Sequence, residues 1–101
     1  MEIVKGDRPP ASFYDPRFGA VRALRAGGKV WYDARTVTKA LWYKDPVQAT
    51  CRTTMIIFPG GQCLCVDTDT LRGLVEASPA PPGLADQFLL WVATTVAPHT
   101  Y

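Results

Sequence analysis

The alternation of apolar and polar positions predicts a β-hairpin in the first third of the chain. In the stretch FGAVRALRAGGKVWYDA, the apolar residues Val21 and Leu24 are interleaved with arginines, and Gly27-Gly28 is a two-residue turn signal. We therefore expect two antiparallel strands, over about residues 18–26 and 29–33.

The period then changes from that of a strand to that of a helix. Asp33 is a suitable N-cap for a helix over about residues 34–42, with three apolar residues at helical spacing, Val37, Ala40 and Leu41. Asp45-Pro46 is a second start signal, because a capping carboxylate precedes a proline at the first helical position. A second short helix is expected from there to about Arg52.

A second hairpin and two more helices follow. The stretch TMIIFPGGQCLCVD predicts strand, turn and strand around Pro59-Gly60-Gly61. Asp67 or Thr68 can cap a helix whose inward residues are Leu71, Leu74 and Val75, and the proline-rich SPAPPG ends it. The last helix is expected over about Leu84 to Val96, before Pro98.

The predicted element order is ββααββαα, with a short helix pair between two hairpins and two C-terminal helices. This arrangement is typical of an α+β fold. Residues 1–17 contain several prolines and are expected to form an N-terminal arm or loop. Residues 18–101 should form a single domain, because 101 residues leave no room for a second core.

The net charge of +2 is distributed unevenly. Residues 29–54 carry five basic residues against two acidic ones, whereas residues 55–101 carry one basic residue against four acidic ones. A total charge this small is weak support for nucleic-acid binding. A positive middle segment beside an acidic C-terminal half would favour an oriented electrostatic contact.

Residues that could carry catalysis or bind a metal are scarce. The three cysteines, Cys51, Cys63 and Cys65, form no CxxC pair, which argues against a zinc site or a disulfide framework. Cys63 and Cys65 share one face of a strand and are expected to be small buried hydrophobes. His99 is the only histidine. We therefore expect no enzyme activity, no cofactor and no metal site.

No apolar run approaches the length of a membrane span. The opening stretch MEIVKGDRPP lacks the apolar centre of a signal peptide. On these grounds we expect a cytoplasmic protein without a membrane partner.

Two separated blocks of the chain resemble the BRO-N domain of phage antirepressors and baculovirus repeated-ORF proteins. In the first block, the stretch VWYDARTVTKALWYKDPVQAT matches the family pattern at Trp31-Tyr32, Val37, Ala40-Leu41, Tyr43 and Asp45-Pro46. In the second block, the matching residues are Leu71, Leu74, Phe88, Trp91-Val92 and Val96-Ala97-Pro98. The resemblance covers about residues 18–101 and implies a BRO-N-like fold and a role in phage regulation.

The chain departs from the family pattern in two ways. Trp42 replaces the glycine that usually follows Ala-Leu, where glycine provides the left-handed conformation that ends a helix. Trp42 is therefore either an exposed anchor for a partner or part of the core. In addition, the stretch EASPAPPGLADQF lacks the basic residues that the family carries between its last two helices.

DNA binding is the leading functional hypothesis from the sequence. In the manner of helix-turn-helix proteins, the two short helices would contact phosphates or base edges. The candidate DNA-binding residues are Arg35, Lys39, Lys44, Gln48 and Arg52, with Thr53 and Thr54. The alternative interpretation is that these are solvated faces of helices that belong to the core.

The second hypothesis is an inhibitor that binds a protein, such as a phage repressor or a host defence complex of the kind that anti-CRISPR proteins target. The last helix is apolar on two sides, with Leu89 and Leu90 outside its inward stripe. We predict that Trp42, Leu89 and Leu90 contact a partner and that the chain forms a homodimer through this helix. Alternatively, the hairpins cover its second side.

Overall fold

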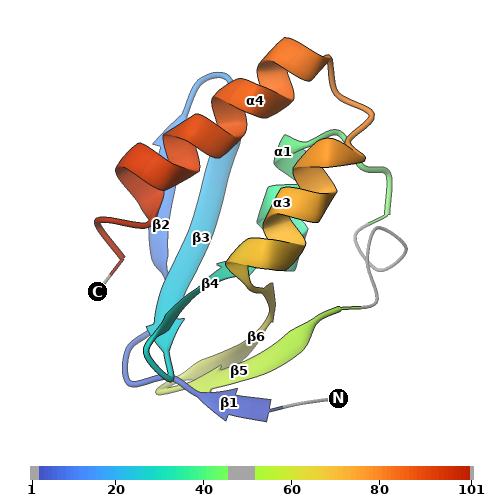
Figure 1. Ribbon diagram of the computed structural model, residues 1–101. Helices are drawn as coiled ribbons and strands as arrows, with labels where there is room; N and C mark the ends of the chain where they lie inside the picture. Colours follow the sequence, from blue (N-terminus) through green and yellow to red (C-terminus); the bar gives the residue numbers. More distant parts are fainter. Residues whose placement is uncertain (1–2, 46–51, 101) are drawn as a thin grey trace.

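A computed structural model describes residues 3–45 and 52–100 and shows a compact α+β fold. The described residues form one six-stranded sheet and three helices, the last of which continues into a π-helical turn, η1 (Figure 1). The strands are β1 (Ile3–Lys5), β2 (Ala11–Asp15), β3 (Gly19–Ala26), β4 (Lys29–Asp33), β5 (Thr54–Phe58) and β6 (Gly61–Val66). The helical segments are α1 (Ala34–Ala40), α3 (Thr68–Glu76), α4 (Pro82–Trp91) and η1 (Val92–Val96).

The two predicted hairpins are confirmed, and they belong to the same sheet. Its strand order is β1-β5-β6-β4-β3-β2. β3 and β4 pair antiparallel across Gly27-Gly28, both of which have positive φ, and β5 and β6 pair antiparallel. β4 and β6 join the hairpins through the pairs Tyr32–Val66 and Asp33–Cys65.

The expectation of an arm or loop over residues 1–17 is wrong for the residues that form β1 and β2. β2 pairs antiparallel with β3, and β1 pairs parallel with β5. The prolines that suggested a loop, Pro9, Pro10 and Pro16, flank β2 instead of interrupting it. Outside the strand they remove no hydrogen bond from the ladder.

The helices follow the expected pattern with shifted ends. α1 starts after Asp33, as predicted, but ends at Ala40, and α4 begins at Pro82, two residues before the expected start. The helix predicted after Asp45-Pro46 falls largely on residues 46–51, which lie outside the described residues. The complete order ββααββαα therefore stays a prediction, and the strands β1 and β2 add to it.

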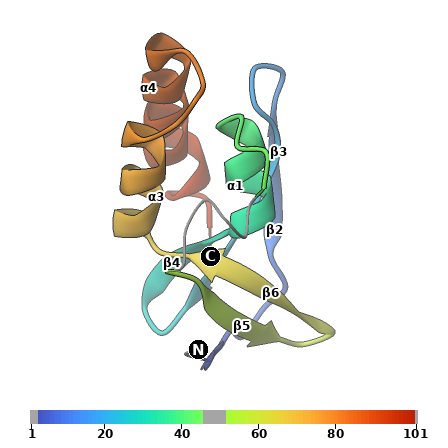
Figure 2. The same ribbon diagram turned by 90° about the vertical axis from the view of Figure 1, so that its right-hand side faces the viewer.

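The larger core lies between the sheet and the helices. It contains Tyr32 and Val66 from the sheet, Leu41 after α1, Leu71 from α3 and Phe88 from α4, none of them more than 1% exposed. Figure 2 shows α1, α3 and α4 on the same side of the β2–β3 hairpin. The predicted inward stripes of all three helices are thus buried against one another and against the sheet.

A smaller core fills the opposite face, where the sheet curls on itself. It contains Leu24, Trp31, Ile56, Cys63 and Cys65. An isolated bridge between Gly6 and Ala26 brings the end of β1 against β3. A Cβ atom on Gly6 would lie 3.2 Å from Cδ1 of Leu24, so glycine permits this close approach.

Candidate binding surface around Trp42

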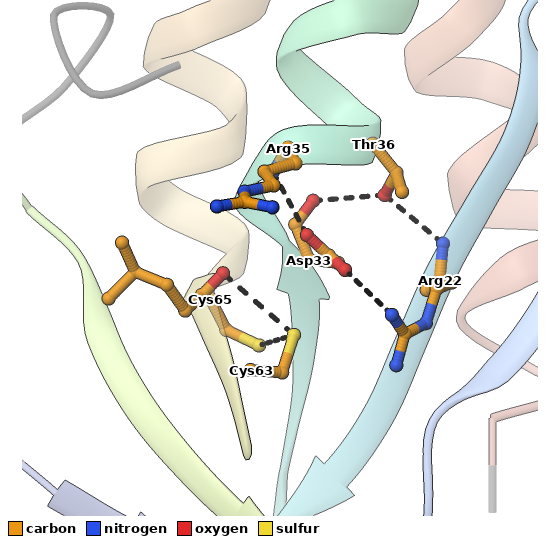
Figure 3. Close-up of polar contacts among 7 residues, drawn as sticks. Arg22, Asp33, Arg35, Thr36, Cys63 and Cys65 are labelled. Carbon is orange, nitrogen blue, oxygen red and sulfur yellow. Dashed lines mark hydrogen bonds and ion pairs between the residues drawn. The ribbon is translucent and has the colours of Figure 1, made fainter. Parts of the chain in front are cut away.

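A polar cluster at the end of β4 fixes the start of α1 (Figure 3). Oδ1 of Asp33 accepts a hydrogen bond from the backbone N–H of Arg35 at 2.9 Å, and its Oδ2 lies 3.4 Å from Nη1 of Arg22. The Thr36 hydroxyl donates to the carbonyl of Asp33 and accepts from the N–H of Arg22. One carboxylate thereby caps the helix and ties it to β3, which determines which side of α1 faces solvent.

Two buried thiols lie beside this cluster. The Sγ atoms of Cys63 and Cys65 are 3.2 Å apart on one face of β6. The hydrogen bond to Cys63 and burial raise the pKa of the Cys65 thiol, so it remains protonated at neutral pH. Nucleophilic attack and metal ligation both require the thiolate. Within the described part of the chain, no three His, Cys, Asp or Glu side chains are grouped to hold a metal ion.

The end of α1 has the hydrogen-bond pattern of a Schellman motif. The N–H of Trp42 donates to the carbonyl of Lys39 at 3.1 Å, and the N–H of Tyr43 donates to the carbonyl of Thr38 at 3.0 Å. This pattern requires a left-handed residue between the helix and the outgoing chain, a position that glycine usually occupies. Trp42 occupies it with φ of 69°, and it is the one non-glycine residue with positive φ in the described ranges.

Contacts on either side hold Trp42 in this conformation. Leu41 is fully buried, and its carbonyl accepts a 2.6 Å hydrogen bond from the Ser78 hydroxyl. The Tyr43 hydroxyl donates to the carbonyl of Leu74 at 2.7 Å, and burial raises the pKa of this phenol. Tyr43 is therefore attached to α3 and Leu41 to Ser78 just after it, and Trp42 lies between these two fixed positions.

Trp42 itself is 55% exposed. The interpretation of Trp42 as part of the core is therefore wrong, and exposure is the feature that an anchor for a partner requires. A left-handed conformation costs a non-glycine residue about 1–2 kcal/mol. The protein thus combines backbone strain with an exposed indole ring at the same position, and strained backbone residues are concentrated at functional sites.

The structure places the candidate DNA-binding residues in two regions. Arg35 and Lys39 are exposed one helical turn apart on α1, and Lys44 is exposed two residues after Trp42. Arg52 lies instead toward the start of α3, where its charge helps to lower the pKa of Asp67. Gln48 lies outside the described residues.

Leu89 and Leu90 border a separate groove. This groove has a volume of about 850 Å³ and lies between the β3–β4 turn, the start of α3 and the end of α4 with η1. Leu89 is half-buried and Leu90 is 64% exposed, so the hairpins do not cover the second side of the last helix. The sequence signal for this surface was that the last helix carries apolar residues on two of its sides.

Sequence reasoning missed the other walls of the groove. Arg25 and Lys29 from the first hairpin and Arg72 from α3 line it together with Tyr32. Burial raises the pKa of the Tyr32 phenol, while a hydrogen bond with Thr68 and the charge of Arg72 oppose that shift. No motif in the sequence marks this convergence, because it depends on how α3 packs against β4.

Comparisons with protein-family models, with curated proteins and with solved structures give no match. Among the described residues, no helix is both long enough and apolar enough to cross a membrane.

Proposed function

We infer that this chain is a non-catalytic regulatory domain that binds a protein target through Trp42 and the basic residues around it. The observation that carries this proposal is the exposed indole ring of Trp42 in a strained, left-handed backbone conformation. The resemblance to BRO-N domains suggests the class of target, which would be a repressor or a host defence complex. Phage regulation or counter-defence is the corresponding biological role.

Trp42 is of a residue type that is common in protein-binding hot spots. Tryptophan and arginine are enriched among residues that contribute most to protein–protein binding. A ring held on fixed backbone loses little conformational freedom on binding, because Leu41 and Tyr43 already hold the turn. Arg35, Lys39 and Lys44 add positive charge, which favours a target with an acidic surface.

Affinity capture from host lysate with tagged variants tests this proposal. Trp42→Ala should lose a protein that the unmodified chain captures in nuclease-treated lysate. Tyr14→Ala is the matched control, because Tyr14 is a 73% exposed aromatic residue on β2. The captured protein should be retained by Tyr14→Ala and should bind the purified chain directly. Equal capture by the Trp42→Ala variant would contradict the proposal.

DNA binding through the same face is the second candidate. The specific observation in its favour is that Arg35 and Lys39 are exposed one turn apart on α1, with Lys44 close by in sequence. Such residues can neutralise phosphates. Capture that disappears after nuclease treatment, and that Lys39→Ala/Lys44→Ala weakens more than Trp42→Ala does, would favour this activity over protein binding.

A further inference from the structure

The last helix presents an exposed stripe that the fold does not use. Asp86, Leu90, Ala93 and Ala97 recur at helical spacing, and Leu90 is the most exposed large apolar residue of the helix. α4 and η1 contain ten and five residues, which corresponds to a length of about 20 Å at 1.5 Å per residue. Asp86 is the only charged residue between Leu84 and Val96.

The groove beside this stripe is elongated. The main hollow of about 850 Å³ and a second hollow of about 320 Å³ between α3 and α4 share Arg72, Asp86 and Leu89. The main hollow is lined by apolar Val30, Leu71 and Val92. An elongated trough with apolar walls suits a helix, which inserts side chains at intervals of one turn.

η1 widens the helix at this groove. The N–H of Ala97 donates to the carbonyl of Val92 at 2.9 Å, which is the i to i+5 hydrogen bond of a π-helix. π-turns of this kind occur at helix C-termini. Here the π-turn brings Val92, Ala93 and Ala97 to the groove wall.

We propose that a second copy of this chain inserts its α4–η1 stripe into the groove, so that two copies form a symmetric dimer with antiparallel last helices. Leu90 lies at the edge of the main hollow, so a twofold axis close to it would pack the two Leu90 side chains together and place the rest of each stripe over the hollow of the other copy. The groove also carries charges of both signs, Lys29 and Arg72 with Asp69 and Asp86. In a twofold dimer, basic side chains of one copy would face acidic side chains of the other.

The position of Asp86 is compatible with this symmetry. If the helices cross at Leu90, the two copies of Asp86 lie eight residues apart along the shared axis, or about 12 Å at 1.5 Å per residue. This separation exceeds the screening length of about 8 Å at physiological salt. The one acidic residue of the stripe therefore causes little repulsion between the two copies.

The main hollow is separate from the surface around Trp42. It lies at the N-terminal end of α3, whereas Leu41 and Tyr43 are attached near the C-terminal end, where only the second hollow reaches Ser78. The dimer does not depend on the proposed function. The dimer would present two Trp42 surfaces, which increases the avidity for a target that carries two or more copies of its binding site.

Sedimentation equilibrium of the full chain tests the dimer. We expect the unmodified chain to be dimeric with a Kd on the order of 10 µM, and Leu90→Lys to weaken that Kd by at least about tenfold. Ile3→Lys is the matched control, because Ile3 on β1 is an aliphatic residue of similar exposure, 61% against 64%. A monomeric unmodified chain at about 100 µM, or equal weakening by both variants, would overturn the proposal.

Disulfide cross-linking tests the twofold symmetry without placing a charged side chain at position 90. Leu90→Cys should form a disulfide between two copies under mild oxidation, because the twofold axis passes close to residue 90. Ile3→Cys and the unmodified chain, treated in the same way, should form no more than background cross-links. A dimer in which Leu90→Cys does not cross-link above that background would overturn the antiparallel arrangement.

Discussion

Trp42 shows how a single residue can work against local stability and still be retained in the fold. Its side chain makes the helix end more costly than glycine would, by about 1–2 kcal/mol for the left-handed backbone. The core does not need this side chain, since the residue is 55% exposed. The partner contact proposed above would give a physical reason to have tryptophan at this position.

Replacing Trp42 with glycine should separate stability from binding. We expect Trp42→Gly to raise the free energy of unfolding by about 0.5–1 kcal/mol, because glycine relieves the strain but increases the entropy of the unfolded chain. Chemical denaturation measures this change. Trp42→Ala is the control, since its Cβ keeps the strain and should give no gain. Both variants should lose target binding, and a Trp42→Gly variant less stable than Trp42→Ala would refute the strain argument.

The start of α3 provides a test at the scale of an element. Asp67 accepts a 2.8 Å hydrogen bond from the backbone N–H of Thr70, which lowers the pKa of Asp67 below its ordinary value of 3.8, with smaller contributions from Lys29 and Arg52. A carboxyl group with a lowered folded-state pKa stabilises the fold above its unfolded pKa. That stabilisation is lost as the pH falls through the folded-state pKa.

Asp67→Asn should remove this pH dependence. Asparagine can still cap the helix but does not titrate. The difference in unfolding free energy between the unmodified chain and the Asp67→Asn variant should therefore be constant above about pH 6 and shrink below about pH 4. Denaturation curves across this range measure the difference. Asp67→Ala should cost about 1 kcal/mol at neutral pH through loss of the cap. An advantage that grows on acidification would contradict the assignment.

At the scale of elements, the sequence predicted what local signals determine. Asp33, Asp67 and Gly27-Gly28 marked two helix starts and a turn correctly, because caps and positive-φ turns depend on neighbouring residues. β1 was missed because its partner, β5, is about fifty residues away in sequence. The groove was missed for the same reason, since its walls come from a hairpin and two helices.

At the scale of the whole molecule, the two basic regions have different surroundings. Arg35, Lys39 and Lys44 belong to the α1 side, whereas Arg52 lies near the acidic start of α3. A duplex bound on the α1 side would therefore contact few phosphates. We therefore expect a modest affinity for DNA. The salt dependence of that affinity reports how many of these basic residues contact phosphates.

Salt titration gives the corresponding prediction. If the chain binds duplex DNA, each phosphate contact contributes a log–log slope of about −0.9, so Lys39→Ala/Lys44→Ala should flatten the slope by roughly two units. Trp42→Ala is the uncharged control and should leave the slope unchanged. Fluorescence anisotropy of a labelled duplex measures both. A slope that is unaffected by the lysine changes would place the DNA contact elsewhere on the molecule.

The bridge between Gly6 and Ala26 also has a consequence for folding order. β1 can pair only once β5 is in place, because this parallel partner lies far along the chain, and such long-range closure is entropically slow. β1 should therefore dock last and open first, as the least protected strand in hydrogen exchange. Gly6→Ala, which brings a Cβ to 3.2 Å from Leu24, should speed exchange at Val4 and Lys5 and leave β3 and β4 protected. Uniform acceleration across all strands would instead mean that the sheet opens as one cooperative unit.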